Sequence, residues 1–223
     1  MKQKALAVMY KPPVAGRVKT RLTPPLTPEE AAGLYRAVLA DVFAGASRVE
    51  GVELYAAATP AEDDEEKTED PADDPVPGGF TRFTQAGEDL GERILSVFNR
   101  LFTGGHGRVV VIGSDSPDLP REYIEDAFGR LEEGGPETVV FGPAEDGGYY
   151  LVGMNTLQDA PFRDVPWSTP MVLEATLEGA RGAGLSVELL DPWYDVDTPE
   201  DLGRLRGNPA APESAAFVDA LGI

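Results

Sequence analysis

Short, unbroken runs of apolar residues recur along the chain. Residues 5–10 form the first run, which stops at two prolines, and residues 108–113 form the most strand-like one. An apolar run without alternation is typical of a central parallel strand that is covered on both faces. Further strands are expected at residues 52–58, 138–141, 149–154 and 187–190.

Between these runs, apolar residues recur at helical spacing. Residues 27–30 combine a capping threonine, a proline and two acids, and apolar residues follow at every fourth position from 34 to 42. This combination is typical of a helix start. Similar stripes predict helices from residue 88 to the Gly104-Gly105 pair, at 121–133 and at 171–183. The alternation predicts an α/β fold, a mostly parallel sheet with helices on both faces.

One segment differs sharply in composition. Residues 60–79 hold nine acids, one lysine and four prolines, a local charge of 1 − 9 = −8. Such a segment cannot bury a face and predicts a solvated acidic loop. We find no internal repeat and no second change of composition, so a single domain over residues 1–223 is expected.

Charge and residue usage exclude several classes of protein. With 19 Lys+Arg against 39 Asp+Glu, the net charge is −20, which disfavours nucleic-acid and membrane partners because both are anionic. The chain has no cysteine, so a disulfide framework and thiolate chemistry are excluded. The first apolar run has six residues, whereas a membrane span needs about 20, and a cytoplasmic location is expected.

The loop at residues 11–22 is basic although the chain as a whole is acidic. Ligands of open α/β sheets bind beyond the carboxyl ends of the strands, where this loop lies. Its basic residues are Lys11, Arg17, Lys19 and Arg21. Because Arg binds phosphate bidentately and Lys acts as a point charge, the cluster predicts an anion site. The alternative is a patch that only offsets neighbouring acids.

Two acidic loops carry candidate metal ligands. Asp115 directly follows the central strand and is followed by Asp118, and the loop at 191–202 contains Asp195 and Asp197. Mg²⁺ takes one or two protein carboxylates and leaves its other positions to water and phosphate, so Asp115 with a second carboxylate from either loop suits Mg²⁺ or Mn²⁺. Two of these acids have an alternative role. Asp118 would be a helix cap, and Asp195 would only solvate an exposed turn.

Two further features are ambiguous or set aside. Residues 142–150 combine acids with the adjacent Gly147 and Gly148, which suits either a ligand close to the backbone or a hairpin turn. The single histidine, His106, lies in a loop before the central strand without a placed partner. We expect it to be exposed and outside the site.

Six strings together resemble a known family. They are KPPVAGRVKTRL (11–22), QAGEDLGERI (85–94), GSDSPDL (113–119), GPAEDGGYYLVG (142–153), DVPWST (164–169) and DVDTPEDL (195–202). In this order they resemble the GT-A-type glycosyltransferase-like proteins associated with arsenosugar biosynthesis. The kin of that family are the nucleotidyltransferases that form molybdopterin guanine dinucleotide and guanylylated phospholactate.

The resemblance implies a nucleotide-diphospho-sugar transferase fold (GT-A, Rossmann-like) with a nucleotide across the carboxyl edge of the sheet. Position by position, it implies phosphate contacts at Gly16, Lys19 and Arg21, beside Lys11 of the same loop. It implies base or ribose contacts at Gln85, Asp89 and Gly91, and metal contacts at Asp115 and Asp197. It implies an acceptor or sugar pocket at Asp146, Gly147, Gly148 and Trp167.

The resulting expectation is a Mg²⁺-dependent nucleotide-sugar transferase that moves a glycosyl group from an NDP-sugar to a small-molecule acceptor. Asp115, Lys19 and Arg21 are its expected catalytic residues, since metal and basic groups stabilise charge on the leaving oxygens. The first alternative is a nucleotidyltransferase that joins an NTP to a phosphorylated small molecule and releases pyrophosphate. The basic loop fits this slightly better, because a triphosphate carries more charge. The second alternative is a non-catalytic nucleotide-binding module.

Overall fold

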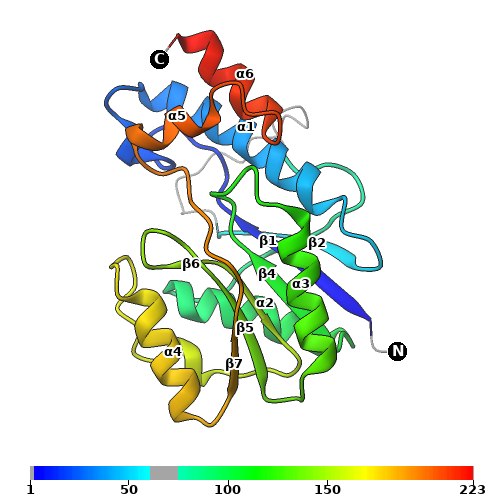
Figure 1. Ribbon diagram of the computed structural model, residues 1–223. Coiled ribbons are helices and arrows are strands. Elements are labelled where there is room, and N and C mark those ends of the chain that lie inside the picture. Colours follow the sequence, from blue (N-terminus) through cyan, green and yellow to red (C-terminus); the bar gives the residue numbers. More distant parts are fainter. Residues whose placement is uncertain (1–2, 61–74, 223) are drawn as a thin grey trace.

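The computed structural model describes residues 3–60 and 75–222, and within them seven strands form one sheet (Figure 1). The strand order is β3-β2-β1-β4-β6-β5-β7. The strands are β1 (Lys4–Tyr10), β2 (Glu53–Ala58), β3 (Thr81–Thr84), β4 (Arg108–Ile112), β5 (Thr138–Pro143), β6 (Tyr149–Met154) and β7 (Ser186–Leu189).

The sheet is parallel except at β6. Strand β6 runs antiparallel to both of its neighbours, β4 and β5, while the other paired strands are parallel. The mostly parallel α/β sheet predicted from the sequence is therefore confirmed. The carboxyl ends of β1, β2, β3 and β4 meet at one edge of the sheet, where a ligand of this architecture binds.

Helices cover both faces of the sheet (Figure 1). The helices of the described residues are α1 (Pro28–Ala46), α2 (Leu90–Thr103), α3 (Arg121–Glu133), α4 (Val172–Gly182), α5 (Leu202–Leu205) and α6 (Pro212–Leu221). Alternate residues of β1 point to opposite faces, so that Leu6 and Val8 pack in the core under α1 and α3, and Ala5 and Ala7 in the core under α2 and α4. The unbroken apolar runs follow from this double burial.

Helix α1 begins where the sequence predicts. The side chain of Thr27 accepts a hydrogen bond from the backbone N–H of Glu30, and Glu30 Oε2 accepts one from the N–H of Thr27 at 2.8 Å. This reciprocal pair satisfies two backbone donors that the helix itself leaves unbonded. It fixes the direction in which the chain leaves the basic loop.

The C-terminal part of the chain returns to α1. From β7 the chain passes along the carboxyl edge of the sheet to α5 and α6, and α6 lies against α1 (Figure 1). The buried carboxylate of Asp41 on α1 accepts hydrogen bonds from the N–H groups of Glu213 and Ser214 and from Ser214 Oγ. This contact holds the first turn of α6 and, with it, the segment that contains Asp197.

Two expectations need separate comment. Residues 61–74 lie outside the described part of the chain, so the solvated acidic loop at 60–79 stays a prediction; the described end of that stretch buries Val76. The expectation that His106 is exposed is wrong, since it is only 8% exposed and its ring nitrogens contact Leu101 O, Glu53 and Tyr55. No helix in the described residues is long and apolar enough to cross a membrane.

Candidate functional site

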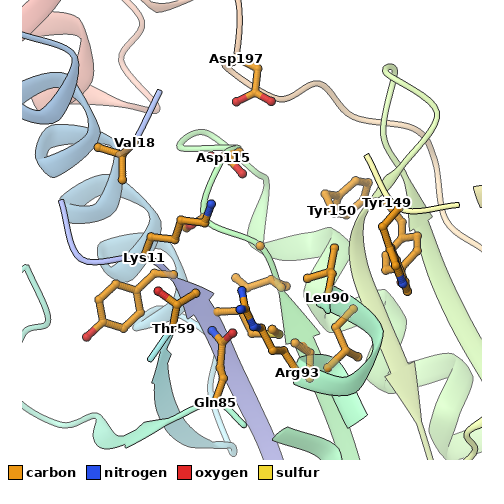
Figure 2. Close-up of a pocket in the computed structure, with 18 of the residues that line it drawn as sticks. Lys11, Val18, Thr59, Gln85, Leu90, Arg93, Asp115, Tyr149, Tyr150 and Asp197 are labelled. Atoms are coloured by element: carbon orange, nitrogen blue, oxygen red, sulfur yellow. The ribbon is translucent and has the colours of Figure 1, made fainter. Parts of the chain in front are cut away.

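A cavity of about 660 Å³ opens at the carboxyl edge of the sheet (Figure 2). Its walls come from the ends of β1, β2, β3 and β4, from the start of α2 and from one side of β6. Eight of the residues named from the sequence line it: Lys11, Arg17, Lys19, Gln85, Asp89, Asp115, Trp167 and Asp197. These residues come from every part of the chain and meet only in the folded protein.

The basic loop after β1 turns Lys19 inward. Lys19 has a left-handed backbone conformation, with φ 48° and ψ 38°, and the short 3₁₀ helix Thr20–Leu22 begins directly after it. Val18 and Leu22, on either side of Lys19, are buried in the core. With both flanking side chains anchored in this way, the lysine side chain lies against the cavity wall and is only 3% exposed.

Three oxygen acceptors surround the ammonium group of Lys19. Lys19 Nζ donates to a carboxylate oxygen of Asp115, to Asp197 Oδ1 at 2.9 Å and to the carbonyl oxygen of Val196 at 2.6 Å. Burial alone would lower the pKa of Lys19, but the two carboxylates outweigh it and raise the pKa above its ordinary value. Lys19 therefore carries a fixed positive charge inside an otherwise acidic protein.

Asp115 and Asp197 come from loops that are joined by their backbones. The N–H of Val196 donates to the carbonyl oxygen of Asp115 at 2.8 Å, which places the segment after β7 beside the end of β4. The two carboxylates are 44% and 38% exposed. They lie at the same end of the cavity (Figure 2).

This donor set fits a hard divalent cation. Carboxylate oxygens are the protein ligands that Mg²⁺ prefers, and Mg²⁺ usually keeps several waters or phosphate oxygens. Within the described residues, no group of three or more His, Asp or Glu side chains converges into a complete protein metal cage. A metal bound by Asp115 and Asp197 would take its remaining ligands from water and substrate phosphate.

Asp195 does not lie in an exposed turn, so that alternative is wrong. Its carboxylate accepts a hydrogen bond from Ser116 Oγ at 2.7 Å. Burial, followed by the negative charge of Asp115, raises the pKa of Asp195 to about 7. The acid holds the loop after β4 against the loop after β7.

Asp118 is neither a helix cap nor a neighbour of the cavity. Its carboxylate accepts hydrogen bonds from Trp193 Nε1 at 3.1 Å, from the hydroxyl of Tyr194 and from Asn208 Nδ2 at 2.8 Å. The N-terminal cap position of α3 belongs to Pro120 instead. Asp118 thus holds part of the C-terminal segment in place outside the cavity.

Tyr35 is a cavity residue that sequence reasoning missed. Its hydroxyl lies 2.7 Å from Ser114 Oγ and accepts a hydrogen bond from the N–H of Lys11 at 3.2 Å. Burial, reinforced by the charge of Asp115, raises the pKa of Tyr35 to about 12, so the phenol stays neutral. In the sequence Tyr35 is part of the apolar stripe of α1, and nothing there distinguishes it from a core residue.

Gln85 forms the wall of the cavity at the ends of β2 and β3. It is 3% exposed, and its Nε2 donates to the carbonyl oxygen of Ala57 at 2.7 Å. That bond fixes the orientation of the side-chain amide. The other end of the amide, Oε1, has no hydrogen-bond partner. Burying an acceptor without a hydrogen bond costs free energy, so Oε1 is available to accept a hydrogen bond from a ligand.

The start of α2 forms the neighbouring wall. Asp89 Oδ1 accepts from the N–H of Glu92 at 2.8 Å and thereby caps the helix. A Cβ at Gly91 would lie 2.7 Å from Trp167 Cζ2, so glycine permits the helix to approach the indole ring.

Arg93, which sequence reasoning also missed, lines the cavity and donates from Nε to the carbonyl oxygen of Gly87 at 3.1 Å. The sequence signal for Arg93 is its position four residues after the capping residue Asp89.

Six of the residues to which the resemblance assigns a contact do not line the cavity. They are Gly16, Arg21, Gly91, Asp146, Gly147 and Gly148. Arg21 is 66% exposed, and its Nη1 lies 4.0 Å from Asp197 Oδ2. Asp146, Gly147 and Gly148 lie in the turn between β5 and β6, in which the N–H of Gly148 donates to Asp146 Oδ1 at 2.8 Å. Their substrate contacts stay predictions.

Comparison with known proteins places the chain in a family. A family model described as "Uncharacterized protein conserved in bacteria (DUF2064)" matches residues 42–169. The chain belongs to the DUF2064 family. The matched range contains Gln85, Asp115 and Trp167, whereas Lys19 and Asp197 lie outside it.

Two relatives cover most of this DUF2064 chain. A 2-phospho-L-lactate guanylyltransferase of Methanothermobacter thermautotrophicus is 30% identical over 192 residues, which is 84% of this chain and 78% of that protein. A crystal structure from Desulfovibrio desulfuricans G20, described as a nucleotide-diphospho-sugar transferase, is 31% identical with a TM-score of 0.85 and covers 99% of this chain and 95% of the other. The expected fold is confirmed.

Two other matches do not inform on the function of this chain. The first supports only the fold. The structure of 4-diphosphocytidyl-2C-methyl-D-erythritol synthase covers 98% of this chain and 99% of that chain, with a TM-score of 0.59 and 11% identity. A nardilysin-like protein of Arabidopsis thaliana is 29% identical over 92 residues, 40% of this chain, and the match spans only 9% of that protein. The DUF2064 chain thus has the fold of nucleotidyl and nucleotide-sugar transferases, while the arsenosugar association stays a prediction.

Proposed function

We propose that this protein is a metal-dependent nucleotidyltransferase, which joins the nucleoside monophosphate part of an NTP to a phosphorylated small molecule and releases pyrophosphate. The observation that carries the proposal is the buried Lys19 ammonium beside Asp115 and Asp197 at the phosphate end of the cavity. The guanylyltransferase relative favours this reaction over glycosyl transfer, which reverses the order given by the sequence alone.

The charge of the cavity agrees with a triphosphate. Four basic side chains line it, those of Lys11, Arg17, Lys19 and Arg93, although the whole chain has a net charge of −20. A triphosphate brings about four negative charges to one place, and a concave site concentrates the attraction of the basic groups. The diphosphate of an NDP-sugar carries less negative charge than a triphosphate and would need fewer cations.

The reaction requires positioning and charge stabilisation from the chain. An oxygen of the acceptor phosphate attacks the α-phosphorus, the bond between the α- and β-phosphates breaks, and the electron pair leaves with pyrophosphate. Lys19 and Lys11 stabilise the charge that develops on the phosphate oxygens, and the low exposure of Lys19 strengthens that interaction. Mg²⁺ or Mn²⁺ held by Asp115 and Asp197 would supply further charge neutralisation.

The decisive assay follows which product leaves. Wild-type protein is incubated with Mg²⁺, each NTP in turn and a set of small phosphate esters and phosphorylated hydroxy acids, with GTP as the first donor. Release of pyrophosphate is expected, together with a product in which the nucleoside monophosphate is joined to the acceptor phosphate through a diphosphate bond. NDP release from an NDP-sugar with no pyrophosphate from any NTP would favour glycosyl transfer, and nucleotide binding without turnover would favour the non-catalytic module.

Gln85 offers a test of where the nucleoside lies. We expect Gln85→Leu to weaken NTP binding by about tenfold, because one hydrogen bond to the nucleoside is lost and Leu cannot replace it. Inorganic tripolyphosphate, which has no nucleoside, should bind the variant and the wild type equally. Isothermal titration calorimetry measures both, and an equal loss for the two ligands would mean that Gln85 acts on the phosphate site or on the fold.

A further inference from the structure

The ammonium group of Lys19 is held like a bound cation. Its three acceptors, an oxygen of Asp115, Asp197 Oδ1 and the carbonyl oxygen of Val196, are oxygen ligands of the kind that a metal ion uses. The side chain of Lys19 is 3% exposed, whereas the carboxylates of Asp115 and Asp197 are partly exposed to solvent. Lys19 neutralises part of the charge of the pair.

The same two carboxylates are those that fit a divalent ion. A divalent ion and an ammonium group that share ligands a few ångströms apart repel each other strongly, since the charges lie in a partly desolvated site. Both cations can be bound only if Lys19 turns to another anion. Lysine is suited to this because its charge lies at the end of a flexible four-carbon stem.

We propose that Lys19 is the resident cation of the Asp115–Asp197 pair and keeps divalent ions from binding to the nucleotide-free protein. The proposal rests on the nucleotidyltransferase function, because the triphosphate is the anion that takes over Lys19. The metal then enters with the nucleotide, and Lys19 passes from the carboxylates to the phosphates. One lysine thereby couples occupation of the metal site to occupation of the phosphate site.

Charge counting shows why the exchange is favourable only with both partners present. Before it, two carboxylates of Asp115 and Asp197 face one ammonium group. A divalent ion alone would balance the carboxylates but leave the Lys19 charge buried without a partner, which is costly. With a triphosphate bound, both cations have anionic partners.

The test measures Mn²⁺ binding without nucleotide, by calorimetry and by the electron paramagnetic resonance signal of free Mn²⁺. Lys19→Gln removes the charge and keeps a donor for the carbonyl oxygen of Val196. We expect it to bind Mn²⁺ about tenfold or more tightly than the wild type, because a competing charge is gone. Lys19→Arg keeps the charge and should bind Mn²⁺ as weakly as the wild type. Adding Asp115→Asn to Lys19→Gln should remove the gain.

Several outcomes overturn the proposal. Equal Mn²⁺ affinity of wild type and Lys19→Gln would show that Lys19 does not compete with the ion, and a gain that survives Asp115→Asn would place the ion elsewhere. Lys19→Met is the second neutral variant, for use if Lys19→Gln does not fold and as a check that the new amide is not itself a ligand. Since no nucleotide or turnover enters these titrations, a failed pyrophosphate assay would refute the proposed reaction without deciding the competition.

Discussion

Asp115→Asn is expected to lower kcat for pyrophosphate release by about 10²–10³-fold, the usual cost of losing one group that stabilises transition-state charge. The change keeps the shape of the side chain and removes the charge that pairs with Lys19 and that the proposed metal would require. The fold should persist, because the side chain is 44% exposed and the backbone bond from Val196 N to Asp115 O remains. Steady-state kinetics and thermal unfolding measure the two effects.

Asp191→Asn is the matched control for this substitution. Asp191 lies in the same acidic segment as Asp197, is exposed and does not line the cavity. Its loss of charge should leave kcat within about twofold of the wild type, as for most exposed positions away from a site. If the two variants lose activity equally, only the overall charge of this edge matters, and Asp115 has no individual role.

The meeting of Lys19, Asp115 and Asp197 could be predicted from their places after strands. Asp115 and Asp197 lie 96 and 178 positions after Lys19 in the chain. Each of the three nevertheless lies in a segment that follows a strand, β4, β7 and β1 respectively, at the carboxyl edge. The apolar run of β4 identifies it as a central strand, and in this architecture the loop after β1 lies beside it. Sequence therefore gives the location without any side-chain geometry.

Side-chain partners could not be predicted in the same way. Asp118, Asp195 and His106 occur in polar loops, so the sequence suggests a helix cap for Asp118 and exposed positions for Asp195 and His106. Each is instead surrounded by groups from distant segments, such as Asn208 for Asp118 and Glu53 for His106. Local pattern describes the chain within a few residues, whereas these contacts depend on tertiary packing.

The sequence also could not decide between the two transfer reactions. Both need a phosphate site, a metal and an acceptor pocket, so Lys19, Arg21 and Asp115 suit either one, and the basic loop favours a triphosphate only slightly. The difference depends on which bond of the donor faces the acceptor, and this is a property of the shape of the cavity. The basic lining of the cavity and the guanylyltransferase relative both favour nucleotidyl transfer.

Lys19 and Arg21 are two residues apart in the basic loop, but we expect very different losses from their removal. Lys19→Met should lower kcat/KM for the NTP by about 10²–10³-fold, because a buried charge at the phosphate end is lost. Arg21→Met should lower it less than about tenfold, since Arg21 is 66% exposed and its Nη1 lies 4.0 Å from Asp197 Oδ2. Steady-state kinetics with the NTP varied at saturating acceptor gives both values.

This pair of variants separates contact with phosphate from general attraction. Raising the salt concentration should weaken the remaining contribution of Arg21 and hardly change that of Lys19, because exposed charges are screened and buried ones are not. A larger loss for Arg21→Met than for Lys19→Met would move the phosphate contact out of the cavity to the exposed side of the loop. Lys19 would then act only as the partner of the two carboxylates, and its removal would change metal binding without changing the affinity for nucleotide.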